Sequence, residues 1–145
     1  MTDSLPSEAA RLFNSGFNCS QSILAAFCEK FGMDRETALK LACGFGGGMG
    51  RLQETCGAVT GAFMLLGLKY GGCTEDGGAA KEKTYSEVRE FAARFAERNG
   101  SIKCRELVGV DFLYGDKKTV SVRVKEICPH MVESAAEILK AMLEF

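Results

Sequence analysis

The run CGAVTGAFMLLGLKYG, residues 56–71, decides the fold class of this chain. About twelve consecutive residues in it are apolar or small, which suits a buried helix and is too short for a helix that spans a bilayer. Thr55 precedes the run and is a suitable N-cap for the helix. The run therefore predicts a buried central helix, around which the rest of the chain must pack.

Helical periodicity continues on the N-terminal side of this run. Ser7 is predicted to cap a short first helix, and Asn18 to cap a second helix that ends at Gly32. Asp34 is predicted to cap a third helix, which ends near Cys43 before a glycine-rich loop. Three short helices are thus expected before the central one.

The C-terminal half is also predicted to be helical. Residues 84–100 form an amphipathic pattern that ends in glycine, and residues 101–112 predict a short helix capped by their first residue, a serine. Residues 117–128 alternate in part like a strand, but a lone strand has no partner here, so a helical or irregular segment is favoured. A last helix is predicted over residues 129–143, with its proline in the first turn.

Composition bounds the class of protein. The chain has 145 residues, of which 46% are hydrophobic, enough for one core. Its 18 basic and 19 acidic residues give a net charge of −1, which favours neither nucleic acid nor an anionic membrane as a partner. The start, MTDSLPSEAARLF, lacks the basic and apolar regions of a signal peptide, so we expect a cytoplasmic protein.

We therefore expect an all-α fold, a single-domain bundle of about six to seven helices over residues 1–145. No membrane insertion is expected. Assembly as a homodimer is left open.

Four of the seven cysteines lie in or beside a predicted helix N-terminus: Cys19, Cys56, Cys104 and Cys128. Unpaired N–H groups there favour a thiolate, but a helix terminus contributes only about 0.3–1 kcal/mol, less than about one pKa unit. Several thiolates held together need a bound cation or cluster, or pairing as disulfides. The alternative is that the cysteines are small core side chains, and the absence of any C-x-x-C pair leaves that alternative open.

The other thiols and the only histidine are given different roles. Cys28 lies in the middle of a predicted helix and Cys43 at a helix C-terminus, so both are predicted to be packing residues, while Cys73 lies in a polar loop. His130 follows Cys128 by two residues and could serve as a ligand or a base. A solvent-exposed residue in the first turn of the last helix is the favoured interpretation of His130.

The segment CGAVTGAFMLLGLKYG, with NCSQS upstream and CREL and ICP downstream, resembles the C_GCAxxG_C_C family. The resemblance extends over most of the chain, residues 16–136. Its motif is matched by Cys56, Gly57, Ala58 and Gly61, in the order Cys-Gly where the family label has Gly-Cys. Members of the family are described as redox-active.

The resemblance implies that four family cysteines form one centre, and these are Cys19, Cys56, Cys104 and Cys128. A related domain in split-Soret cytochromes is associated with an iron–sulfur centre. We therefore expect these four residues to lie around one site, as catalytic thiols or as ligands of an iron–sulfur cluster. They would serve electron transfer or thiol exchange with an unidentified redox partner. A structural zinc site without redox chemistry is the alternative, and a centre with no cofactor at all is a third.

Glycines provide the remaining candidate positions. Gly57 and Gly61 are four residues apart on one helix face, and each costs about 1 kcal/mol relative to alanine, which implies close approach of a cofactor or of another helix. The loop GFGGGMGR could bind a small anion with the help of Arg51, but it lacks the spacing of the nucleotide-binding motifs. A flexible connection that lets Cys56 move is the favoured interpretation of this loop.

Overall fold

The computed structural model of the protein describes residues 5–145 and confirms the all-α prediction. Its helices are α1 (Leu5–Asn14), α2 (Cys19–Phe27), α3 (Arg35–Ala42), α4 (Gly46–Met49), α5 (Gly57–Tyr70), α6 (Ala79–Asn99), α7 (Cys104–Val108) and α8 (Lys117–Leu143). Short 3₁₀ turns occupy Cys28–Phe31 and Cys43–Phe45. Within the described range no strand forms, and the only β pairing is an isolated bridge between Thr55 and Lys103.

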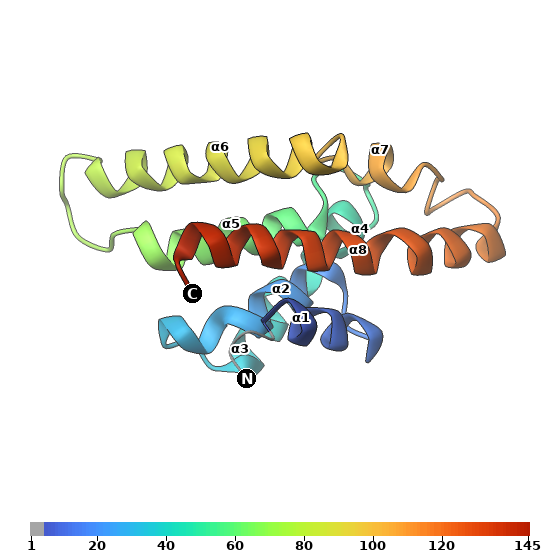
Figure 1. Ribbon diagram of the computed structural model, residues 1–145, viewed down its shortest axis with the longest axis horizontal. Coiled ribbons are helices and arrows are strands. Elements are labelled where there is room, and N and C mark those ends of the chain that lie inside the picture. The colour runs from blue at the N-terminus through green and yellow to red at the C-terminus, as the bar shows by residue number, and fades with distance from the viewer. Residues whose placement is uncertain (1–4) are drawn as a thin grey trace.

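The predicted central helix is α5, which packs against α2, α6 and α8. The long helices α6 and α8 lie alongside it, and α1, α2 and α3 pack on the side away from α6 (Figure 1). Its buried residues occupy all faces of the first two turns, as expected for a helix surrounded by protein. None of the described helices is both long enough and apolar enough to cross a membrane.

The caps of the second and third helices confirm two predictions. The side chain of Asn18 accepts a hydrogen bond from the Gln21 N–H at 2.9 Å, and the Gln21 side chain accepts one from the Asn18 N–H at 3.0 Å. Asp34 accepts a hydrogen bond from the Thr37 N–H at 3.0 Å. Gly32, with φ of 81°, ends the segment that begins at α2, as glycine at a helix end commonly does.

Three predicted caps are wrong. Helix α1 has already begun at Leu5, so Ser7 lies inside its first turn. The N-cap of α5 is Cys56 and not Thr55, because Thr55 is held in the bridge with Lys103. Lys103 is likewise the N-cap of α7, and the Ser101 hydroxyl accepts a hydrogen bond from the Lys103 N–H at 3.0 Å instead.

The last helix begins earlier than predicted. Asp116 caps α8 by accepting a hydrogen bond from the Thr119 N–H at 2.9 Å, and the helix continues through Pro129 to Leu143. The strand-like alternation was ambiguous because Val120 and Val124 are separated by four residues, a spacing that places them on one face of a helix as well as of a strand. Pro129 therefore lies inside the helix, where it lacks the N–H that would bond the preceding turn.

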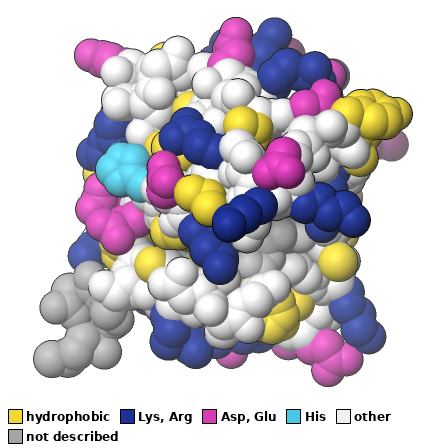
Figure 2. All heavy atoms as spheres, turned by 90° about the vertical axis from the view of Figure 1, so that its right-hand side faces the viewer, with side chains coloured by type: hydrophobic (Ala, Val, Ile, Leu, Met, Phe, Trp, Pro, Cys, Tyr) yellow, Lys and Arg dark blue, Asp and Glu magenta, His cyan; other side chains and the backbone are white. Residues whose placement is uncertain are grey.

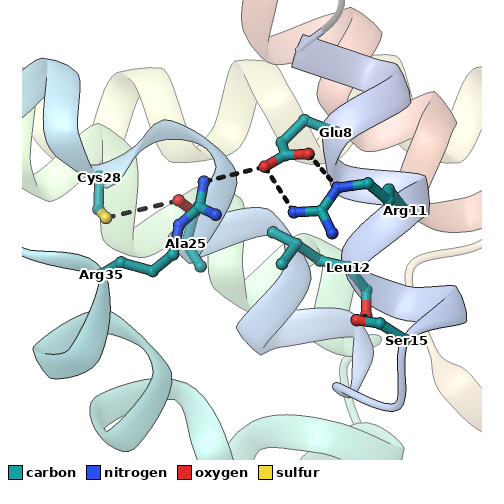
Figure 3. A network of polar contacts seen from close by, with 7 residues as sticks. All are labelled: Glu8, Arg11, Leu12, Ser15, Ala25, Cys28 and Arg35. Carbon is teal, nitrogen blue, oxygen red and sulfur yellow. Dashed lines mark hydrogen bonds and ion pairs between the residues drawn. The ribbon is translucent and has the colours of Figure 1, made fainter.

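A charged network joins α1 to α3 (Figure 3). The Glu8 carboxylate accepts hydrogen bonds from Arg11 at 2.6 and 2.9 Å and from Arg35 at 3.1 Å. Arg11 first, and Arg35 with it, lower the pKa of Glu8 to about 2, against the opposing effect of burial. The Cys28 thiol lies nearby, where it donates to the Ala25 carbonyl within its own helix at 3.5 Å.

Candidate functional site

Four thiols from four separate elements line one cavity of about 900 Å³. They belong to Cys19, Cys56, Cys104 and Cys128, and all four residues are buried. Cys19 begins α2, Cys56 caps α5, Cys104 begins α7, and Cys128 lies within α8. The fold thus brings together the four cysteines that the sequence analysis singled out.

The bridge between Thr55 and Lys103 positions two of these cysteines. The Cys56 N–H donates to the Ile102 carbonyl at 2.7 Å, and the Cys104 N–H donates to the Glu54 carbonyl at 2.7 Å. These reciprocal bonds hold the starts of α5 and α7 side by side. Both thiols therefore enter the cavity from a short, doubly hydrogen-bonded piece of backbone.

Cys19 is brought to the cavity by close packing of α2 on α5. A Cβ atom on Gly57 would lie 3.1 Å from the Cys19 Cβ, and one on Gly61 would lie 2.9 Å from the Ser20 carbonyl oxygen and 3.0 Å from the Ile23 Cβ. These positions are too tight for a larger residue. The close approach inferred from the two glycines is therefore an approach of helix α2; Gly57 also lines the cavity, whereas Gly61 faces α2.

Cys128 reaches the cavity from α8, which is anchored to the end of α7. The Arg123 guanidinium donates to the Val108 carbonyl at 3.1 Å. Because α8 begins near Asp116, Cys128 lies in mid-helix, and the prediction that it sits at a helix N-terminus is wrong. Its neighbour Pro129 also lines the cavity.

Gln53 is a positioning residue that the sequence analysis missed. Its buried side chain donates to the Val110 carbonyl at 2.7 Å and accepts from the Phe112 N–H at 2.9 Å. The same residue has a positive φ of 57°. Gln53 thereby links the glycine-rich segment to the connection between α7 and α8 by hydrogen bonds. No local sequence pattern predicts such a contact.

The glycine-rich segment forms a left-handed turn. Five successive residues, 47 to 51, have φ between 60° and 69°, and the Gln53 and Glu54 N–H groups donate to the carbonyls of Gly47 and Gly48 at 3.1 and 2.9 Å. A Cβ on Gly48 would lie 2.7 Å from the Cys104 Cβ. The segment is thus a packed support for Cys104 and not the flexible connection that its glycines suggested.

Burial is the main influence on the pKa of two of the four thiols, and the hydrogen bond between the other two is the main influence on theirs. Burial is the largest cause that raises the pKa of Cys56 to about 11 and that of Cys104 to about 12. The pKa of Cys19 is raised well above its usual range, first because its thiol donates a hydrogen bond to Cys128 and then because it is buried. The same hydrogen bond lowers the pKa of Cys128.

These pKa shifts contradict the prediction that helix N-termini favour the thiolate form at all four cysteines. At Cys19, Cys56 and Cys104 the N-terminus is present, yet the pKa is raised. The hydrogen bond with Cys128 is the largest cause at Cys19, and at Cys56 and Cys104 the cost of placing a charge away from water exceeds the contribution of a helix end. Only Cys128, in mid-helix, has a lowered pKa.

The thiols are free and are not gathered around a point. All seven cysteines carry free thiols. Across residues 5–145 no three His, Cys, Asp or Glu side chains are grouped so that they could hold a single metal ion. The four thiols therefore line one cavity without forming a site for a single metal ion.

The remaining candidate residues are not members of this group of four thiols. Cys28 is fully buried in the core, which confirms its packing role. Cys43 is exposed at the edge of the cavity, so its predicted packing role is wrong, and its carbonyl accepts a hydrogen bond from Asn18 at 2.9 Å. Cys73 is exposed in the loop after α5, and His130 is exposed on α8, as expected.

The fold and the site define a class: a small all-α protein in which four buried thiols surround one cavity. The chain belongs to the C_GCAxxG_C_C family, described as "Putative redox-active protein", which matches residues 17–142. No curated protein and no solved structure matches the chain.

Proposed function

We propose that this is a redox protein whose four cysteines, Cys19, Cys56, Cys104 and Cys128, hold an iron–sulfur cluster used for electron transfer. The observation that carries the proposal is the arrangement of four buried thiols, from four separate elements, around one cavity. Four cysteine thiolates are the usual ligands of [2Fe–2S] and [4Fe–4S] clusters. A cluster bound there would supply one-electron transfer.

The surroundings of the thiols support this ligand role. Cys19 and Cys104 are the first residues of α2 and α7, and Cys56 is the N-cap of α5; the first N–H groups of a helix lack partners within it. The backbone N–H groups of Ala58 and Val59, in the first turn of α5, lower the pKa of Cys56 and so oppose the larger effect of burial. Such donors would stabilise the negative charge of coordinated thiolates, and the buried setting would keep water from them.

The spacing of the thiols supports a cluster over a single zinc ion. Zinc binds four sulfurs at about 2.3 Å each, which requires the thiols to meet at one point. No such grouping occurs among the described residues. A cluster holds its cysteine sulfurs further apart than a single zinc ion does, because several iron atoms share the ligands.

A second candidate function rests on the pairing of Cys19 with Cys128. Both residues line the cavity, and each shifts the pKa of the other, that of Cys19 upward and that of Cys128 downward, so this pair could serve as a dithiol–disulfide couple. In exchange with an external disulfide, the two thiols would give up two electrons and two protons and form one S–S bond, and the external disulfide would be released as two thiols. This couple needs only two of the four cysteines, which is why the cluster is the first proposal.

Anaerobic reconstitution with ferrous iron and sulfide tests the proposal. We expect visible absorption that bleaches with dithionite and iron that stays bound through gel filtration. Serine at any one of the four cysteines should remove or weaken both, whereas Cys73→Ser, at an exposed loop position, should change neither. Colourless protein with a reversible Cys19–Cys128 disulfide would favour the second candidate, and a stoichiometric, colourless zinc complex would contradict both.

A further inference from the structure

The cavity is larger than the thiols require. Its volume of about 900 Å³ is at the upper end of the range for pockets that bind small organic molecules, about 300–1,000 Å³. Much of its wall lies beyond the four cysteines, on α1, on the connection between α7 and α8, and on the first half of α8. This part of the cavity has no role in holding a cluster.

Aromatic and branched apolar side chains form the extra wall. Phe13 and Phe17 contribute from α1 and the connection that follows it, and Phe112 from the connection between α7 and α8. Val120 and Val124 add one face of α8. All five are only partly buried, so each retains surface that a ligand could cover. Rings from two separate connections suit a flat aromatic ligand, because aromatic pairs gain from stacked or edge-to-face contact.

The charge at the cavity is one-sided. Arg51 and Lys125 both line it and are exposed, and neither is in an ion pair with any residue from 5 to 145. The described residues that line the cavity include no Asp or Glu. Figure 2 shows the end of the molecule where α7 and the start of α8 lie, with Lys and Arg side chains interspersed with Asp and Glu across the middle of the face. Two cations without acidic neighbours in the wall favour an anionic group on the ligand.

We propose that this cavity binds a planar aromatic small molecule that carries one negatively charged group, held beside the four thiols. The rings of Phe13, Phe17 and Phe112 would contact its aromatic part, and Arg51 or Lys125 its anionic group. If the four cysteines hold a cluster, the bound molecule would exchange electrons with it, and this part of the inference rests on the proposed function. Binding of the molecule itself requires no cluster.

A pair of fluorescent probes separates the two features of the proposed ligand. The probe 8-anilino-1-naphthalenesulfonate has the predicted ring system and one anionic group, and N-phenyl-1-naphthylamine has the same rings without the charge. We expect saturable binding of one equivalent of the sulfonate, at least fivefold tighter than binding of the neutral amine. Equal affinity for both probes would contradict the anionic part of the proposal.

Three variants locate the bound probe. Val124→Trp should fill part of the cavity and weaken both probes at least fivefold, whereas Lys125→Glu should weaken the sulfonate alone. Tyr85→Ser removes an exposed ring on α6, outside the residues that line the cavity, and should change neither affinity. Loss of binding in Tyr85→Ser with full binding in Val124→Trp would place the probe on the surface and overturn the proposal. Circular dichroism of each variant confirms that it is folded.

Thiol protection connects the ligand to the centre. In the cluster-free protein, the bound sulfonate should slow alkylation of Cys128 by iodoacetamide at least threefold and leave the rate at exposed Cys73 unchanged. Unchanged alkylation of Cys128 at saturating probe would contradict binding beside the thiols. Iron loading is measured separately, so protein that binds the probe but no cluster would contradict the proposed function alone, and the reverse result would contradict this inference alone.

Discussion

Thr55 and Lys103 form an antiparallel bridge that fixes the next residue of each segment, Cys56 and Cys104, at the wall of one cavity. The two segments are far apart in sequence, and each begins a helix immediately after the bridge. The bridge thus converts two helix starts into one rigid unit. The geometry of half of the candidate site is set by backbone hydrogen bonds, which do not depend on the thiols themselves.

The packing of α2 on α5 predicts opposite effects for two glycines of one helix. Gly61→Ala should lower the free energy of unfolding by about 1–2 kcal/mol, because the cost of overpacking against Ser20 and Ile23, about 1–3 kcal/mol, exceeds the gain in helix propensity. A Cβ atom on Gly67 would meet no atom within 4 Å, so Gly67→Ala should raise the free energy of unfolding by up to about 1 kcal/mol. Urea denaturation of both variants measures the difference, and stabilisation by Gly61→Ala would show that α2 does not approach so closely.

Gln53 should be required for the order of the connection between α7 and α8. Gln53→Ala leaves the Val110 carbonyl and the Phe112 N–H without their partner and should cost about 1–3 kcal/mol of unfolding free energy. Gln53→Gly removes the same bonds but suits the positive φ of 57° better, so it should cost less than the alanine variant. Equal loss in both variants would mean that backbone strain at this position contributes nothing.

Two cysteines outside the group of four should respond differently to serine. Cys28 is fully buried, so Cys28→Ser should cost about 1–3 kcal/mol of unfolding free energy by burying a hydroxyl. Cys43 is exposed, and Cys43→Ser should change that free energy by less than about 0.5 kcal/mol. Both variants should still load iron to the parent level, as measured by iron analysis after reconstitution. Loss of iron in the folded Cys43→Ser protein would add Cys43 to the ligand set.

Glu8 predicts how stability changes in acid. Its pKa is about 2 in the folded protein and 4.5 ordinarily, so the Glu8 network stabilises the fold above about pH 4.5, and that contribution is lost as the pH falls toward 2. Glu8→Gln should therefore be less stable than the parent at pH 7, and the difference should shrink at about pH 3. Denaturation at both pH values tests this.

The control for this prediction is an exposed ion pair. On α3 the Glu36 Oε1 atom lies 3.3 Å from the Lys40 Nζ atom, and the side chains of Glu36 and Lys40 are 79% and 78% exposed. Glu36→Gln should change the free energy of unfolding little at either pH, because solvent screens such pairs. A pH-independent effect of Glu8→Gln would show that its bonds to Arg11 and Arg35 add no ionic stabilisation.

Local signals in the sequence predicted most of the helices and part of the site. The caps at Asn18 and Asp34 were found because each bonds an N–H three residues away. The start of α8 was missed because the spacing of Val120 and Val124 fits a strand and a helix equally well. The role of Gln53 was missed because its partners lie 57 and 59 residues further along the chain, a separation that no local pattern encodes.

The four cysteines of the candidate site were selected from the sequence partly for a reason that the structure corrects. Helix starts did point to Cys19, Cys56 and Cys104, and these residues do begin or cap helices beside one cavity. Cys128 was included on a helix start that does not exist, yet it lines the same cavity from mid-helix. Position along the chain therefore identified the thiols, whereas their protonation depends on burial and mutual contact, which only the folded structure defines.

The left-handed turn provides the most local test of how the fold supports the site. Gly48 and Gly50 have nearly the same φ, 64° and 60°, so alanine at either position carries a similar left-handed strain, about 1–2 kcal/mol. A Cβ on Gly50 meets no atom within 4 Å, whereas one on Gly48 would lie 2.7 Å from both the Cys104 Cβ and the Gln53 Cα. The difference between the two variants therefore isolates the contact of the turn with the site.

We expect Gly48→Ala to be less stable than Gly50→Ala by about 1–3 kcal/mol in urea denaturation, the cost of forcing a methyl group into packed surroundings. The added methyl group would clash with Cys104 and with Gln53. Gln53 directly precedes Glu54, and the Glu54 carbonyl accepts a hydrogen bond from the Cys104 N–H, so the same variant should also displace the Cys104 thiol. Iron bound after reconstitution should fall in Gly48→Ala and remain at the parent level in Gly50→Ala, with both proteins folded by circular dichroism. Equal stability and equal iron content in the two variants would mean that the turn does not hold Cys104 in place, and the support assigned to it would have to be given up.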